Sequence, residues 1–288
     1  MKLLKSRSLL IVYGICVLLI LAGTFLDFNL SKLIANEQSQ FGRFFLLFGQ
    51  FPVMLCGFSA SALLLKSLPE DKNERMIFTA LAAGGFVGGL IGVKEIIENA
   101  EGFRMILYIL IELLIACGMF LFVYMTCDTR NPARMRRTAL FILFTVLITT
   151  AMVVFIKIPW GRPRYRSIVA VPNLEYQPWY VIGKSACDAF EGILDHDEFK
   201  SFPSGHTASA AYLLTLIALK NVVPVLKDQE RLLMIIAFAW VILTAIARIA
   251  AGAHFLTDVT FGFLITFTIM ILCAKLFRIG GGKKTQQN

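Results

Sequence analysis

The sequence has little charge and lacks the features that mark a soluble domain. Only 16% of its 288 residues are charged, 57% are hydrophobic, and the mean hydropathy is +0.72. A soluble globular domain is nearer half apolar and a quarter charged. No repeat array, low-complexity region or separate polar domain is visible. The composition therefore favours a membrane protein over a soluble one.

The six cysteines do not form a recognisable framework. Four lie within apolar segments, one lies beside a basic loop, and only Cys187 lies in a long polar loop. No pair has the spacing of metal ligands. We expect these cysteines to be small buried hydrophobic residues. The sequence predicts no disulfide, no metal site and no other cofactor.

Apolar blocks of about twenty residues predict an all-α fold, a polytopic bundle of transmembrane helices. About eight spans are predicted, at residues 9–26, 44–65, 76–93, 105–125, 139–156, 204–225, 232–250 and 257–277. The first block follows a charged start, as in a signal peptide, but its length is closer to that of a span, and we expect it to be kept. The glycine-rich block predicts close helix packing.

The basic residues separate the apolar blocks, so the net charge of +9 does not indicate a nucleic-acid partner. The side that holds both termini carries fifteen Lys or Arg residues, against four in the short links on the other side. Cytoplasmic loops are enriched in these residues, which predicts cytoplasmic termini in a multi-pass cell-membrane protein. The loop 157–203 and the corner 248–258 then both face outward. Three polar clusters, at 157–164, 202–207 and 248–258, thus emerge on one face and indicate a single site.

The cluster at Ser204, Gly205 and His206 opens an apolar segment. Serine is a good N-cap, and glycine lets a ligand approach the backbone. The amides at such a helix start attract anions. By itself, the tetrapeptide from Pro203 to His206 is also consistent with a simple helix cap.

A second cluster contains Arg248, His254 and Asp258. His254 and Asp258 are four residues apart, the spacing that places two side chains on one helical face. A carboxylate that holds one imidazole nitrogen leaves the other free to act as a nucleophile. A structural ion pair between Arg248 and Asp258 is the alternative, but it leaves His254 without a role.

The third cluster contains Lys157 and Arg164, whose ammonium and guanidinium groups suit phosphoryl oxygens. Arg162 and Arg166 have the position of interfacial anchors, and we keep that interpretation for Arg166. Phosphoryl transfer depends mostly on positioning and charge stabilisation, so cations and helix amides are suitable parts.

Together the three clusters resemble the type 2 phosphatidic acid phosphatase superfamily, in its membrane-bound lipid phosphatase branch. That superfamily carries the signatures K-x6-R-P, P-S-G-H and S-R-x5-H-x3-D. The matching residues, in that order, are Lys157 and Arg164; Pro203 to His206; and Arg248, His254 and Asp258. Two positions depart, with Tyr165 for proline and Ala247 for serine. The departures imply altered loop geometry, substrate preference and turnover.

The resemblance covers about residues 105–277 and implies a six-helix phosphatase core. We accordingly expect additional N-terminal helices at 1–100 and the core at 101–288. It further implies a metal-independent reaction with His254 as nucleophile, Asp258 orienting it and His206 as acid and base. The phosphate would be held by a set of cations and amides from Lys157, Arg164, Ser204, Gly205 and Arg248.

The implied substrate is a membrane lipid phosphate: a polyprenyl pyrophosphate, a phosphatidate or a phosphatidylglycerol phosphate. A lipid phosphotransferase with the same nucleophile is the alternative, and a transporter that uses Glu112 and the glycine-rich span is a more distant one. A haloperoxidase-like use of the pocket is remote. His196 matches no signature position, and we expect it to be a solvated loop residue. The sequence does not predict the oligomeric state.

Overall fold

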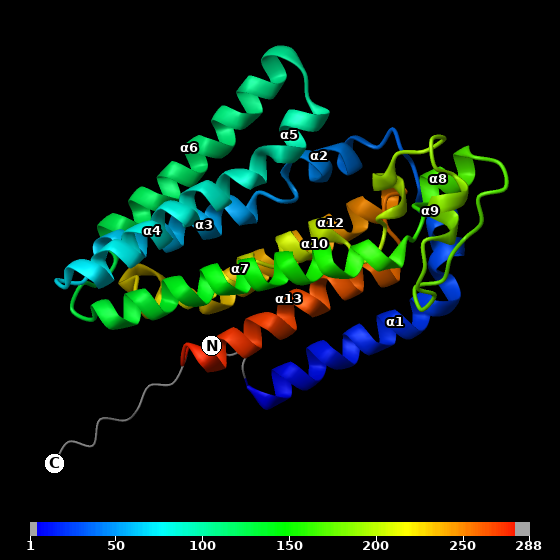
Figure 1. The fold of residues 1–288 in the computed structure, drawn as a ribbon. Helices are drawn as coiled ribbons and strands as arrows, with labels where there is room; N and C mark the ends of the chain where they lie inside the picture. The colour runs from blue at the N-terminus through cyan, green and yellow to red at the C-terminus, as the bar shows by residue number, and fades with distance from the viewer. Residues whose placement is uncertain (1–4, 280–288) are drawn as a thin grey trace.

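A computed structural model describes residues 5–279 of the chain as a bundle of long helices (Figure 1). No β-strand occurs within this range, so the predicted all-α fold is confirmed. Three basic residues that were counted for the orientation, Lys2, Lys283 and Lys284, lie outside the described residues.

Among residues 5–279, seven helical segments are long and apolar enough to cross a membrane. They are Ser6–Ile34, Gln40–Lys66, Lys72–Asn99, Gly102–Thr126, Pro132–Ala170, Glu230–Ala250 and Leu256–Leu276. The helices within them are α1 (Ser6–Ile34), α2 (Gln40–Phe48), α3 (Pro52–Lys66), α4 (Lys72–Gly89), η2 (Leu90–Val93), α5 (Lys94–Asn99), α6 (Gly102–Thr126), α7 (Pro132–Trp160), α8 (Tyr165–Ala170), α12 (Glu230–Ala250) and α13 (Leu256–Leu276). The long loop adds α9 (Ser185–Ala189) and η3 (His196–Phe199).

The predicted sixth span, 204–225, is not one helix. It consists of α10 (Gly205–Ala210), α11 (Leu213–Leu216), η4 (Ile217–Asn221) and η5 (Pro224–Leu226). The Ser204 amide donates to Asp258 O at one end of this segment, and Val222 O accepts from the Asp128 amide at the other. The segment therefore runs along the bundle as an eighth, interrupted pass, and it is buried almost throughout.

Helix α1 is longer than its predicted span. The predicted span ends at residue 26, so Asp27 was expected in a connection, but the helix continues to Ile34 and Asp27 is buried inside the protein. The buried residues of α1 form one stripe, Cys16, Gly23, Asp27 and Ser31. Most of its other side chains are exposed, as expected for a helix that faces lipid.

The glycine-rich helix α4 packs closely on α3. A Cβ atom on Gly57 would lie 2.3 Å from the carbonyl oxygen of Gly85, so the two backbones are nearly in contact there. Small residues permit this approach between helices in lipid. The predicted packing role is confirmed at Gly85, whereas a Cβ atom on Gly84 or Gly88 would find no described atom within 4 Å.

The three polar clusters lie at one end of the bundle, where the loop with α8 and α9 lies beside the last turns of α1 (Figure 1). The start of α1 and the last turns of α13 lie at the opposite end of the bundle (Figure 1). Helices α1 to α5 pack directly on the later helices, α1 on α13 and α3 on α7. The domain boundary at residue 100 stays a prediction.

Candidate active site

Five of the predicted site residues come together at one end of the bundle. Lys157 and Arg164 flank the end of α7, Arg248 lies in the last turn of α12, and His254 lies in the link to α13. Burial lowers the pKa of His254 well below its usual value, and the charges of Lys157, Arg248 and Arg164 lower it further. His206 is also close enough to lower this pKa. These five residues therefore form one positively charged cluster around a neutral imidazole, and we call this cluster the pocket.

Arg248 is a buried cation without a side-chain partner in the part of the chain that the structure describes. Its side chain is 2% exposed. Within residues 5–279, neither a hydrogen bond nor an ion pair of its guanidinium is found, and its Nε atom lacks an acceptor. The Nε atom of Arg164 also lacks one. The other end of the Arg164 guanidinium is paired, because its Nη1 lies 3.5 Å from Glu198 Oε1. Since buried guanidinium groups are normally paired, Arg248 points to an anion as its partner.

The His254 ring is held by a backbone carbonyl. Its Nδ1 lies 2.6 Å from Ser201 O, and 3.9 Å from Asp258 Oδ2. The expected direct hydrogen bond to Asp258 is therefore absent, and His254 precedes α13 instead of sharing a helical face with it. Assigned from these distances, the proton is on Nδ1, which leaves Nε2 as the unprotonated nitrogen.

Asp258 reaches His254 through Ser201. Its Oδ2 accepts from Ser201 Oγ at 2.5 Å and from the Phe255 amide at 2.8 Å. The carboxylate thus caps the start of α13 and fixes the residue whose carbonyl holds the imidazole.

At the start of α10, the Ser204 amide, which was predicted to bind the phosphate, is already hydrogen-bonded within the protein. The Ser204 amide donates to Asp258 O at 2.9 Å, and its hydroxyl accepts from the Thr207 amide at 3.3 Å. Gly205 stands at the first position of α10, where a helix offers its N–H no internal acceptor. A Cβ atom on Gly205 would meet only Lys157 Cε, at 3.9 Å. No other described heavy atom lies within 4 Å of that position, so the Gly205 backbone is open on the side that faces Lys157.

His206 contacts the N-terminal helices. Its Nε2 lies 3.2 Å from Leu46 O and 3.7 Å from Glu95 Oε1. Gln50 Nε2 donates to the same Glu95 oxygen at 2.8 Å. Glu95 was not predicted as a site residue, because in the sequence it lies in a short charged link that matches no signature.

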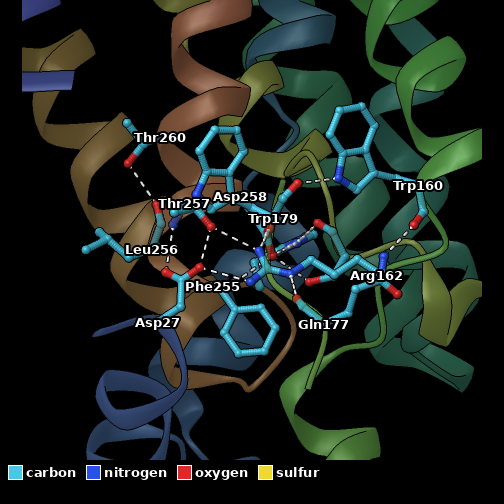
Figure 2. A network of polar contacts seen from close by, with 12 residues as sticks. Asp27, Trp160, Arg162, Gln177, Trp179, Phe255, Leu256, Thr257, Asp258 and Thr260 are labelled. Carbon is cyan, nitrogen blue, oxygen red and sulfur yellow. Dashed lines mark hydrogen bonds and ion pairs between the residues drawn. The ribbon is translucent and has the colours of Figure 1, made fainter. Parts of the chain in front are cut away.

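Arg162 is not an interfacial anchor. It is fully buried, and its guanidinium lies between two carboxylates (Figure 2). Nη1 pairs with Asp258 Oδ1, and Nη2 lies 3.0 Å from Asp27 Oδ2. The sequence missed this network because its members are far apart along the chain.

Arg166 also makes a specific contact, with Glu198, which in turn lies 3.5 Å from Arg164 Nη1. Burial alone would raise the pKa of Glu198, but hydrogen bonds from Arg166 and Ser167 lower it. Glu198 is therefore ionised and holds both arginines at the edge of the pocket.

The remaining predicted features lie away from the pocket. His196 Nδ1 lies 3.3 Å from Cys187 Sγ, and no group of metal-ligating residues is found within residues 5–279. All six cysteines are free, and Cys117 is the one that is exposed. The Glu112 carboxylate is buried in α6, with no hydrogen-bond partner among the described residues.

The two departures from the signatures have structural counterparts. Tyr165 begins α8, and its ring contacts Phe28 of α1 and Phe255, with centroids 5.6 and 6.4 Å apart. Ala247 is fully buried, and its carbonyl lies close to Gly42 of α2. Both positions therefore contribute to packing between early and late helices.

Comparisons with known proteins agree with the signatures. Residues 138–279 match a family model described as the PAP2 superfamily. The chain is 37% identical over 81 residues to Phosphatidylglycerophosphatase B of Bacillus subtilis (strain 168), covering 27% of this chain and 40% of that protein. It is 30% identical over 149 residues to Lipid phosphate phosphatase 1 of Arabidopsis thaliana, covering 47% and 43%. The chain thus spans about two fifths of each relative's length. No solved structure matches it.

Proposed function

Because the chain belongs to the PAP2 superfamily through residues 138–279, we propose that it is a membrane lipid phosphatase that acts through a phosphohistidine. The resemblance expected from the three signatures is confirmed by this match. Phosphatase names on both relatives support the activity, and the helices that are apolar enough to span a membrane support a lipid substrate.

One observation carries the proposal. The unprotonated nitrogen of His254 lies among cations, and one of them, Arg248, has no partner among residues 5–279. Hydrogen bonding to Ser201 O commits Nδ1 of His254, so Nε2 is the nucleophilic atom. Lys157, Arg164 and Arg248 supply three positive charges beside it. A phosphate monoester or diphosphate brings the negative charge that this pocket can hold.

The reaction has two steps. His254 Nε2 attacks phosphorus, the P–N bond forms, and the P–O bond to the lipid breaks. His206 gives a proton to the leaving oxygen. Water then attacks the phosphohistidine, His206 takes its proton, and the P–N bond breaks to release inorganic phosphate and neutral His254. The Leu46 carbonyl and the Glu95 carboxylate can hold the His206 ring while it carries a proton.

The proposed site opens on the outer face of the cell membrane, with both termini in the cytoplasm. The excess of basic residues at the opposite end of the bundle supports this orientation. Labelling with a membrane-impermeant thiol reagent tests it, with a Lys184→Cys variant expected to react in intact cells and a Lys227→Cys variant only after lysis.

Phosphate release by the detergent-purified protein tests the activity. The substrates are a polyprenyl pyrophosphate, a phosphatidate and a phosphatidylglycerol phosphate, each assayed in EDTA and with or without an alcohol acceptor. We expect release that survives EDTA and disappears in a His254→Ala variant. Acid-labile radioactive phosphate on wild-type protein but not on the variant would establish the intermediate. Transfer to the acceptor without phosphate release would instead show a phosphotransferase.

A further inference from the structure

Asp27 lies in α1, outside the segment that matches the PAP2 superfamily. Its side chain is 1% exposed on a helix that is otherwise mostly exposed. A carboxylate within a membrane-spanning helix is costly unless it is paired. Its position therefore requires partners within the protein.

Both carboxylate oxygens of Asp27 have such partners (Figure 2). Oδ1 accepts from the Thr257 amide at 3.0 Å, and Oδ2 accepts from Arg162 Nη2 at 3.0 Å and from the Thr257 hydroxyl. Thr257 precedes Asp258 directly, so one carboxylate of α1 holds both Arg162 and the first turn of α13.

Arg162 is fixed from every side by these contacts. Its guanidinium carbon lies 4.2 Å from the centre of the Phe255 ring. The acceptors of its N–H groups are Gln177 O, Thr257 Oγ1, Tyr176 Oη, Asp27 Oδ2 and Asp258 Oδ1. A planar guanidinium with acceptors on all three nitrogens has one orientation. Nη1 is thereby directed at the oxygen of Asp258 that Ser201 does not use.

We propose that Asp27 is a positioning residue for the nucleophile. It fixes Arg162, which fixes Asp258; Asp258 holds Ser201, and the Ser201 carbonyl holds Nδ1 of His254. Helix α1 is therefore a working part of the active site. The inference rests on the proposed role of His254.

The docking of α1 at this point has independent support. A Cβ atom on Gly23 would lie 2.6 Å from Thr257 Cγ2, so a larger residue could not permit the observed approach. One turn from Asp27, Thr24 Oγ1 accepts from Trp179 Nε1 at 2.9 Å. Beyond the helix, the Asn36 amide donates to Ala250 O at 2.6 Å. These contacts hold α1 in the position that places Asp27 beside Thr257.

An Asp27→Asn variant of the full chain tests the proposal. The amide preserves the size of the side chain but removes its charge. We expect kcat to fall by about 100-fold, as for a small misplacement of a reacting group. KM should change little, because Lys157, Arg164 and Arg248 remain in place. The matched control is Ser31→Ala, also buried on α1, whose hydroxyl has no partner among the described residues; it should behave as wild type.

A double variant shows whether Asp27 acts through Arg162. If it does, Asp27→Asn/Arg162→Lys should be no slower than Arg162→Lys alone. Losses that multiply, or an Asp27→Asn protein with normal kcat and a lower melting temperature, would overturn the proposal in favour of a purely structural role.

A substrate-free measurement separates this inference from the proposed function. Diethyl pyrocarbonate modifies exposed histidines, and peptide mass spectrometry identifies which. His254 should react several-fold faster in Asp27→Asn than in Ser31→Ala, with His196 reacting equally in both. Equal His254 rates would overturn the positioning role. Absence of phosphate release from wild type, with faster His254 labelling in the variant, would refute the phosphatase activity alone.

Discussion

Replacing Arg248 with methionine should make the protein more stable and inactive. The buried Arg248 Nε–H finds no acceptor among residues 5–279. An unsatisfied buried donor costs about 1–3 kcal/mol, and the unpaired charge adds to that cost. Methionine fills the same space without either penalty. We expect the free energy of unfolding to rise by at least about 1 kcal/mol, which raises the melting temperature by about 2–4 °C.

Arg162→Met is the matched comparison, because the two arginines are equally buried at the same end of the bundle. Arg162 pairs with Asp27 and Asp258, so its removal leaves two carboxylates without their cation. Breaking a buried pair in this way costs about 3–5 kcal/mol. Both variants should lose phosphate release, but their melting temperatures should change in opposite directions.

The assay is thermal unfolding of detergent-purified protein, with and without inorganic phosphate. An anion that binds the folded state raises the melting temperature according to its affinity. Phosphate should stabilise wild type and leave Arg248→Met unaffected. If Arg248→Met instead melts as low as Arg162→Met, Arg248 has a partner within the protein, and the assignment of the pocket to an anion is wrong.

Three further predictions concern the same site. Gly205→Ala should raise KM for a lipid phosphate about tenfold, which corresponds to about 1.4 kcal/mol of binding free energy. The melting temperature should not fall, because the added methyl group would meet only Lys157 Cε. Ser201→Ala should lower kcat by about 10- to 100-fold, since it removes a hydrogen bond to a charged group worth about 1.5–3 kcal/mol while keeping the carbonyl. The lowered pKa of His254 means that the unfolded chain binds a proton near pH 6.5 that the folded protein binds only at lower pH. Melting temperature should therefore fall as pH decreases through about 6.5, and His254→Gln should weaken that dependence.

The sequence identified residues that come together in the structure, because each cluster of charged residues directly adjoins an apolar segment. Lys157, Arg164, Arg248 and His254 lie where apolar segments end, and those ends share one side of the bundle. Because consecutive spans run in opposite directions, the topology alone was enough to bring these residues to one side. The fold class followed from the same blocks, since their length permits only helices.

The sequence could not predict how His254 is held. A backbone carbonyl such as that of Ser201 has no side-chain signature, so the four-residue spacing pointed to Asp258 instead. Asp27 was assigned to a connection because an acidic residue ends an apolar run. Gly23, Asp27 and Ser31 are spaced four residues apart and share one face of α1. This spacing was the signal in the sequence that could have placed Asp27 on the buried face of the helix.

The interrupted pass at 204–225 was equally hidden from hydropathy. Its side chains are as apolar as those of a continuous span, but its turns tighten after Ser209, where the Tyr212 amide donates to Ser209 O. The carbonyl of Tyr212 accepts from the Thr215 hydroxyl at 2.7 Å and from Cys56 Sγ at 3.5 Å. The Thr215 amide also donates to Tyr212 O, at 2.9 Å. Tighter backbone hydrogen bonds, supplemented by side chains, therefore satisfy the buried carbonyl where the regular helix is interrupted.

The charges around His254 explain why Arg162 belongs to the site although it faces away from the expected phosphate. Asp258 lies 3.9 Å from the imidazole, and an uncompensated carboxylate there would repel an incoming phosphate. Arg162 neutralises Asp258, so the field at His254 is set by Lys157, Arg164 and Arg248. Asp27 in turn balances the charge of Arg162 and accepts a hydrogen bond from its Nη2. Carboxylates and cations therefore alternate away from His254, and α1 supplies the outermost carboxylate, Asp27.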